Sequence, residues 1–123
     1  VDVRIRVQNS VGLAELESAP QPDIAWVREK SYREGRPQPS DVLLVVEVSD
    51  SSLELDRGDK ANLYANAGLA DYWIINLQDW CVEVYRDPSS SGYREKRTFD
   101  SGQTVSPLAF PDLRLDIGEL FRR

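Results

Sequence analysis

Two acidic residues and one lysine are of the types that metal-dependent hydrolysis can use. Glu47 follows Val42–Val46, the longest apolar run of the chain, where an ionised carboxylate is costly unless it is paired or binds a metal. Asp23 comes directly after a proline at the start of a shorter apolar run, and Lys60 follows within the next predicted helix. Carboxylate oxygens are the ligands that magnesium and manganese prefer, so the pattern indicates a divalent-metal site.

Each of these residues also has a simpler explanation. Glu47 could end a strand and face water, and Asp23 could belong to a turn, because Pro-Asp is common there. Lys60 lies four residues after Asp56 and could form an exposed helical ion pair worth only ~0.2–0.5 kcal/mol. The combination favours chemistry: two carboxylates on neighbouring strands can share one cation, while a lysine holds a phosphate oxygen or helps to activate water.

Several other classes of function are excluded by residues that the chain lacks. It has no histidine, so a Ser-His-Asp triad, a Cys-His pair and a histidine-rich zinc site are impossible within it. Neither a GxxxxGK[ST] loop nor a GxGxxG turn is present. The single Cys81 cannot form an internal disulfide, which fits a reducing cytoplasm. No apolar run approaches the ~20 residues that span a bilayer, so we expect no membrane partner.

The charge balance is acidic, with a formal net charge of −6. Binding to a nucleic-acid backbone is driven largely by Lys and Arg, so this balance does not favour tight DNA binding by one chain. Bound metal ions would cancel local acidic charge, and a dimer could gather basic residues in one groove. We therefore expect a homodimer.

The hydrophobic pattern predicts three strands before the first helix. Val1–Val7 alternates apolar and polar residues, and Ile24–Val27 is a second short apolar run. Val42–Val48 is apolar on both parities, as expected for a central strand covered on both faces. The segments 12–22 and 29–40 are rich in turn residues and are predicted to be loops.

The second half of the chain predicts a helix and then further strands. Ala61, Tyr64 and Ala65 lie on one helix face between Ser52 and Ala67, and Gly68 suits the left-handed residue past the end. The other predicted elements are a hairpin of Asp71–Leu77 and Trp80–Tyr85 joined by Gln78-Asp79, a turn over Asp87–Gly92, a strand over Tyr93–Phe99, a short alternating run Leu113–Ile117 and a helical turn Glu119–Phe121.

This order predicts a mixed β-sheet with at least one packed helix, in the α/β or α+β class. At 123 residues, positions 1–123 are expected to form one domain. The chain opens at Val1 and contains no methionine, so we expect that an upstream segment is missing.

Three segments together resemble a known family. They are Pro22-Asp23, the stretch Leu44–Ser52 that contains Glu47, and the stretch Asp56–Ile75, which includes Asp-Arg-Gly-Asp-Lys and Asp-Tyr-Trp-Ile-Ile. In these segments the chain resembles the Uma-type restriction endonuclease family, bacterial proteins of the PD-(D/E)XK nuclease superfamily. The resemblance extends from about Val3 to Phe121, and it is most specific between Val42 and Ile75.

The resemblance implies a role for each matching position. Asp23 and Glu47 would bind magnesium or manganese, together with the backbone carbonyl of Val48. The superfamily usually has a lysine two residues after the acid, but this chain has Ser49 there, and Lys60 would be the substitute. The matching positions Ser49, Ser52 and Asp56 are more simply interpreted as helix capping and local pairing.

The implied function is a metal-dependent endonuclease acting on DNA, with the restriction-endonuclease-like core but without its N-terminal helix. Two alternatives stay open: a non-catalytic scaffold that keeps the fold for dimerisation or partner binding, and an RNA-directed or toxin-like nuclease. The hairpin aromatics are expected to serve the core or a dimer interface rather than base stacking; they are Tyr72, Trp73, Trp80 and Tyr85.

Overall fold

A computed structural model of the chain describes residues 3–7, 23–28 and 41–121. The loops predicted over 12–22 and 29–40 lie outside the described residues. The strands are β1 (Val3–Val7), β2 (Ile24–Arg28), β3 (Val42–Ser49), β4 (Asp71–Asn76), β5 (Cys81–Ser89), β6 (Gly92–Phe99), β7 (Thr104–Val105) and β8 (Leu115–Asp116). The helical segments are α1 (Leu53–Leu55), η2 (Asp56–Lys60), α2 (Ala61–Asn66) and α3 (Ile117–Leu120).

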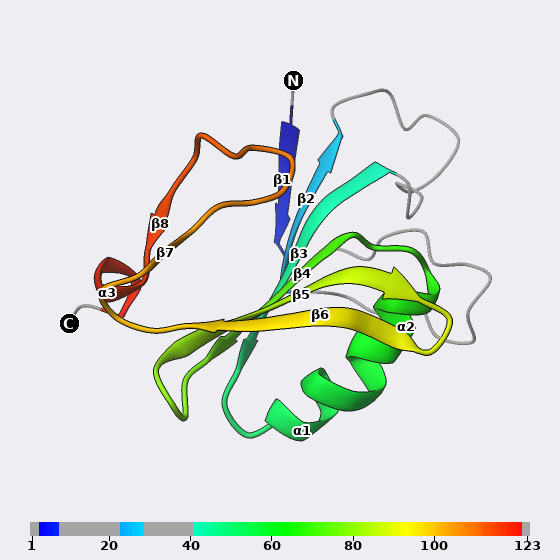
Figure 1. Ribbon diagram of the computed structural model, residues 1–123, viewed down its shortest axis with the longest axis horizontal. Helices are drawn as coiled ribbons and strands as arrows, with labels where there is room; N and C mark the ends of the chain where they lie inside the picture. The colour runs from blue at the N-terminus through cyan, green and yellow to red at the C-terminus, as the bar shows by residue number, and fades with distance from the viewer. Residues whose placement is uncertain (1–2, 8–22, 29–40, 122–123) are drawn as a thin grey trace.

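One six-stranded sheet, in the order β1-β2-β3-β4-β5-β6, forms the body of the described structure (Figure 1). Neighbouring strands are antiparallel except β3 and β4, which are parallel. A parallel pair needs a crossover, and the helical segment from α1 to α2 supplies it. The mixed sheet with a packed helix confirms the predicted α+β class.

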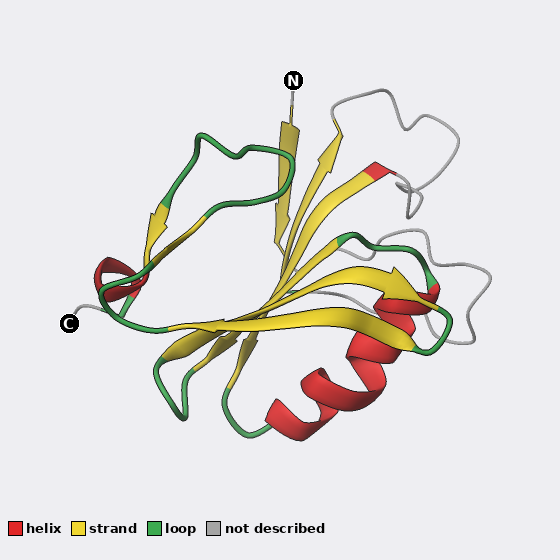
Figure 2. Cartoon of the chain, viewed as in Figure 1, coloured by secondary structure: helices red, strands yellow, loops and turns green. Residues whose placement is uncertain are grey.

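The two faces of the sheet carry separate apolar clusters. The helix packs on one face, where the rings of Tyr64, Tyr72 and Tyr85 are buried. On the other face, the segment containing β7, β8 and α3 packs against the sheet through Val105 and Ile117 (Figure 2). Because β3 lies between two strands and is covered on both faces, its residues are apolar on both parities, as predicted.

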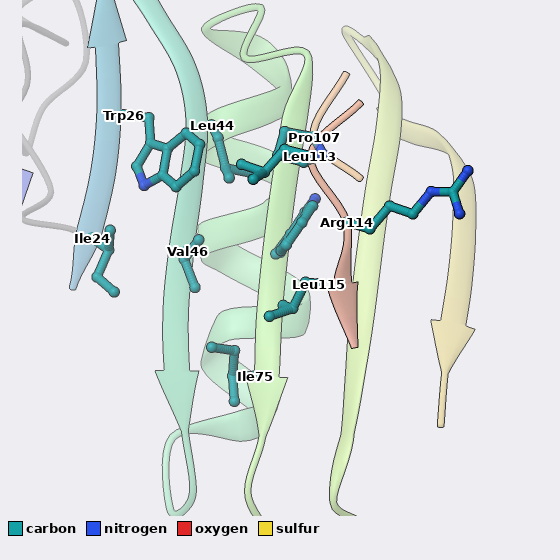
Figure 3. A pocket seen from close by; sticks show the side chains of 10 residues that line it. Ile24, Trp26, Leu44, Val46, Ile75, Pro107, Leu113, Arg114 and Leu115 are labelled. Atoms are coloured by element: carbon teal, nitrogen blue, oxygen red, sulfur yellow. The ribbon is translucent and has the colours of Figure 1, made fainter. Parts of the chain in front are cut away.

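An apolar hollow of about 310 Å³ lies on the face opposite the helix, between the sheet and the C-terminal segment (Figure 3). Its walls include Trp26, Leu44, Val46 and Leu115. Leu44 and Val46 alternate along β3 with Val45 and Glu47, so the hollow is separated from Glu47 by the thickness of the sheet.

The helix follows its prediction in position but not in winding. Leu53–Asn66 is continuous, and Gly68 adopts the predicted left-handed conformation with φ of 81°. The middle five residues, Asp56–Lys60, form a π-helix rather than an α-helix. Apolar periodicity did not indicate this change, because a single wide turn alters the pattern too little to be read from one sequence.

Two predicted turns differ from the structure. The β4–β5 connection takes four residues, 77–80, instead of two, because the side chain of Asn76 accepts hydrogen bonds from the amides of Gln78 and Asp79 and closes a wider turn. The turn predicted over Asp87–Gly92 is wrong in extent, since β5 continues to Ser89. Pro88 is tolerated there because β5 extends beyond the end of its pairing with β4.

The hairpin aromatics divide into two groups. Tyr72, Trp73 and Tyr85 are buried, as predicted for core residues. Trp80 is 45% exposed because it lies in the turn, and its ring packs edge-on against that of Phe121 at 5.5 Å between centroids. Within the described part of the chain, no helix is long and apolar enough to cross a membrane.

Candidate active site

The structure brings Asp23 beside Glu47 through the pairing of β2 with β3. Ile24 pairs with Val46, so one further step along this antiparallel register places Asp23 opposite Glu47. The amide of Asp23 donates to Oε1 of Glu47 at 3.1 Å, and the amide of Val48 donates to Oδ2 of Asp23 at 2.7 Å. Each of the two carboxylates thus accepts a hydrogen bond from a backbone amide of the neighbouring segment.

Glu47 is buried, with 1% of its surface exposed, although it lies in the second half of β3. Its Oε2 accepts a hydrogen bond from Tyr64 Oη at 3.0 Å and lies 3.1 Å from Nζ of Lys60. Lys60 and Tyr64 are four residues apart, so both reach the same carboxylate from one helix face. The possibility that Glu47 faces water at a frayed strand end is therefore excluded.

Lys60 is shared between two acidic side chains. Its Nζ lies 3.2 Å from Oδ1 of Asp56, in addition to its contact with Glu47. The side chain of Asp56 is only 2% exposed, while that of Lys60 is 29% exposed. Ser52 Oγ donates to Oδ2 of Asp56 at 3.1 Å, and Tyr72 donates to the Asp56 carbonyl at 2.8 Å. The pair of Asp56 and Lys60 is therefore part of a buried network and not a solvated surface pair.

Burial and these contacts shift the proton affinities of the central groups. Burial raises the pKa of Glu47, although the Asp23 amide, Lys60 and Tyr64 oppose the shift. Burial alone would lower the pKa of Lys60, but Glu47 and Asp56 outweigh it, and the net pKa is raised. Burial also raises the pKa of Tyr64 well above the range of ordinary phenols. Lys60 is accordingly a cation and Tyr64 a hydrogen-bond donor at neutral pH.

The donor atoms at this site fit a hard divalent cation. Asp23 and Glu47 offer carboxylate oxygens, and Val48 offers a main-chain carbonyl on the same strand. Within the described residues, the acidic residues Asp23, Glu47 and Asp56 are connected to one another through hydrogen bonds and through Lys60. Among residues 23–27 and 41–121 no three acidic or cysteine side chains cluster closely enough to hold a metal by themselves.

Ser49 occupies the position at which the resemblance leads one to expect a lysine. It lies two residues after Glu47, on the same face of β3, and is fully buried. Its Oγ has no hydrogen-bond partner among the described residues. A serine brings no charge, whereas Lys60 brings its ammonium group to Glu47 from the helix. Lys60 thus supplies to Glu47 a positive charge that Ser49 cannot.

Sequence reasoning did not identify Tyr64 as a contact of Glu47. It was recognised only as part of an apolar helix face, although its spacing of four residues from Lys60 was the available signal. Asp56 shows the expected local pairing, since its carboxylate accepts from Ser52 and contacts Lys60, but the pair is buried rather than exposed.

Comparison with known proteins shows the family and the fold of the chain. None of the curated proteins matches the sequence. The fold is similar to a solved structure described as "Crystal structure of a putative nuclease belonging to DUF820 from Anabaena variabilis ATCC 29413". The TM-score is 0.69 at 20% sequence identity, and the match covers 97% of this chain and 68% of that one. Residues 2–118 match the Uma2 family, described as "Putative restriction endonuclease", and the chain therefore belongs to that family.

Proposed function

We propose that the chain is a metal-dependent nuclease that hydrolyses phosphodiester bonds in DNA, as an endonuclease. The observation that carries this proposal is the buried carboxylate of Glu47, which lies beside Asp23 and 3.1 Å from the ammonium group of Lys60. Membership in the Uma2 family and the restriction-endonuclease-like fold support it.

Asp23, Glu47 and the carbonyl of Val48 would hold one Mg²⁺ or Mn²⁺. Such an ion lowers the pKa of a bound water and offsets the charge that develops on the phosphate. Glu47 must be ionised to bind it, so the raised pKa of Glu47 makes metal affinity increase with pH.

Lys60 would place a positive charge next to the phosphate that is attacked. Its raised pKa keeps it protonated, so it serves as a charge and hydrogen-bond donor rather than as a base. Its side chain is 29% exposed, which leaves part of it accessible to a ligand from solvent. Asp56 and Tyr64 hold Lys60 and Glu47 in place and need not contact the nucleic acid.

The acidic balance of the chain bears on how DNA would bind. With 21 acidic and 15 basic residues, a single chain offers a weak electrostatic attraction to a duplex. A homodimer that gathers its basic residues in one groove, with divalent ions at both sites, would reduce this repulsion.

The test combines metal binding with cleavage. Because a ligand that binds only the folded state raises its stability, Mg²⁺ or Mn²⁺ should raise the Tm of the wild-type chain. Glu47→Gln keeps the shape but not the charge, and it should abolish both this rise and the cleavage of DNA. Glu54→Gln, the same change at an exposed helix position, is the matched control and should preserve both.

Parallel incubations with RNA separate a DNA enzyme from an RNA-directed one. Cleavage that persists in Glu47→Gln would contradict the proposed site. A chain that binds no metal and cleaves neither polymer would instead be a scaffold with a nuclease fold.

A further inference from the structure

A second buried glutamate lies in the same row of the sheet as Glu47. Glu47 pairs with Ile74 across the parallel strands, and Ile74 pairs with Glu83 across β4 and β5. Paired residues point to the same face, so Glu83 also faces the helix, two strand spacings or about 9.5 Å from Glu47. Glu83 is 1% exposed, and the proposed reaction does not use it.

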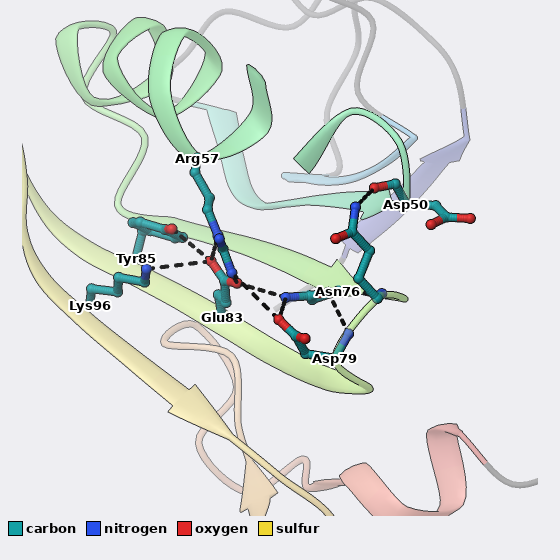
Figure 4. Close-up of polar contacts among 8 residues, drawn as sticks. Asp50, Arg57, Asn76, Asp79, Glu83, Tyr85 and Lys96 are labelled. Atoms are coloured by element: carbon teal, nitrogen blue, oxygen red, sulfur yellow. Dashed lines mark hydrogen bonds and ion pairs between the residues drawn. The ribbon is translucent and has the colours of Figure 1, made fainter. Parts of the chain in front are cut away.

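Glu83 is bound from four directions (Figure 4). Nε of Arg57 donates to both carboxylate oxygens at 3.0 Å, and Tyr85 and Asn76 donate at 2.8 and 3.0 Å. Nζ of Lys96 lies 3.6 Å away. Burial would raise the pKa of Glu83, but Arg57 and the other donors outweigh it, and the net pKa is lowered. The carboxylate is therefore ionised at neutral pH and serves as a charged anchor.

Arg57 is the contact that connects this anchor to the helix. It belongs to the π-helical segment Asp56–Lys60, three residues before Lys60. Within this segment, Arg57 forms an ion pair with Glu83 and Lys60 forms one with Glu47. The two glutamates lie in one row across the sheet. These two attachments, together with the bond from Tyr72 to the Asp56 carbonyl, restrict the rotation of the segment against the sheet.

The β4–β5 turn reinforces the anchor. Asn76 holds both Glu83 and Asp79, and the side chain of Gln78 donates to the carbonyl of Asp50, in the loop that leads into the helix (Figure 4). The start of the helix and its π-helical segment are therefore both bonded to β5 or to the β4–β5 turn.

We propose that Arg57 and Glu83 are positioning residues, which hold the π-helical segment so that Lys60 stays directed at Glu47. The inference rests on the proposed function, because it assigns a purpose to the placement of Lys60. It predicts that Lys60 leaves Glu47 when the anchor is removed, even though neither Arg57 nor Glu83 touches Lys60 in the structure.

The experiment measures acetylation of individual lysines by mass spectrometry, without metal or nucleic acid. The chain has only Lys30, Lys60 and Lys96, so each site is resolved. Only the neutral amine reacts, so an ion-paired lysine is labelled slowly. In Arg57→Met combined with Glu83→Gln, which removes both charges together, Lys60 should be labelled severalfold faster relative to Lys30.

Single variants separate positioning from direct electrostatics. Removing the Arg57 charge alone favours the charged form of Lys60 and would slow its labelling, whereas loss of the anchor would accelerate it. We therefore expect Lys60 to be acetylated faster in Arg57→Met than in the wild type, which is opposite to the direct electrostatic effect. Lys96→Gln is the control, since it removes a charge beside Glu83 without touching the helix, and the rate at Lys60 should not change.

If the double variant fails to fold, Arg57→Met alone carries the test, because Glu83→Gln would itself speed the labelling of Lys60 by removing a nearby negative charge. An unchanged rate at Lys60 in either folded variant overturns the proposal. Because the labelling requires no catalysis, a chain that never cleaves nucleic acid would leave this result standing and refute only the proposed function.

Discussion

The phenol of Tyr64 donates a hydrogen bond to Oε2 of Glu47 at 3.0 Å, in the buried layer between the helix and the sheet. This oxygen is also the one that Lys60 contacts, while Oε1 accepts from the Asp23 amide. Tyr64 therefore helps to satisfy a carboxylate that burial would otherwise make costly. It also limits the orientations in which Glu47 could meet a ligand.

Tyr64→Phe should destabilise the chain by about 1.5–3 kcal/mol, the usual value for a hydrogen bond to a charged group. Tyr93→Phe is the matched control, because Tyr93 donates to a neutral acceptor, the carbonyl of Leu69. Its loss should be smaller, about 0.5–1.5 kcal/mol. Urea denaturation at neutral pH measures both, and an equal or larger loss in Tyr93→Phe would refute the special role of Tyr64.

The stability of the metal-free chain should depend on pH through Glu47. Burial raises the pKa of Glu47 in the folded state, although Asp23, Lys60 and Tyr64 oppose this shift. Lys60 also contacts the carboxylate of Asp56. Between the ordinary glutamate pKa and the raised pKa of folded Glu47, the folded state binds more protons than the unfolded state. The stability that Glu47 contributes therefore decreases as pH rises above the ordinary glutamate pKa.

Denaturation curves in a chelator, at pH values from about 4 upward, measure this dependence. The difference in free energy of unfolding between the wild type and Glu47→Gln should fall with rising pH, since the variant cannot ionise. If this difference stays constant or grows with pH, the pKa of Glu47 is not raised in the folded state.

The ion pair of Arg57 and Glu83 should contribute far more to stability than surface pairs do. Arg57→Met leaves the buried carboxylate of Glu83 without its main partner. Because the arginine side chain is 38% exposed, while Tyr85 and Asn76 still donate to the carboxylate, the cost should be about 1.5–3 kcal/mol. Arg94→Met breaks the pair with Asp87, in which both side chains are more than half exposed, and should cost less than about 1 kcal/mol. Chemical denaturation of the two variants compares them, and similar losses would contradict the buried-anchor interpretation.

Two glycines in and after the helix should respond oppositely to alanine. Gly68 has φ of 81°, so Gly68→Ala should destabilise the chain by about 1–2 kcal/mol. Gly58 lies within the helical segment, and a Cβ there would meet no atom within 4 Å. Gly58→Ala should therefore stabilise by about 0.5–1 kcal/mol. Thermal melts test the pair, and a gain in Gly68→Ala would disprove the capping role.

From the sequence alone, the strands of the six-stranded sheet, the helix and their order could be predicted, but the short strand β7 could not. Val42–Val48 is apolar on both parities, and only a central strand covered on both faces accommodates that pattern. Gly68 marked the helix end, because only a residue without Cβ adopts its conformation cheaply. Asp23, Glu47 and Lys60 were identified from their chemistry and from the family resemblance, before any distance between them was known.

Tertiary structure decided what these residues contact. The pairing of β2 with β3 places Asp23 opposite Glu47, and such a register depends on contacts between segments that are distant in the sequence. The row that joins Glu47 to Glu83 across Ile74 has the same origin. The π-helical winding of Asp56–Lys60 is likewise coupled to buried partners on the sheet, and local sequence carries no signal of those partners.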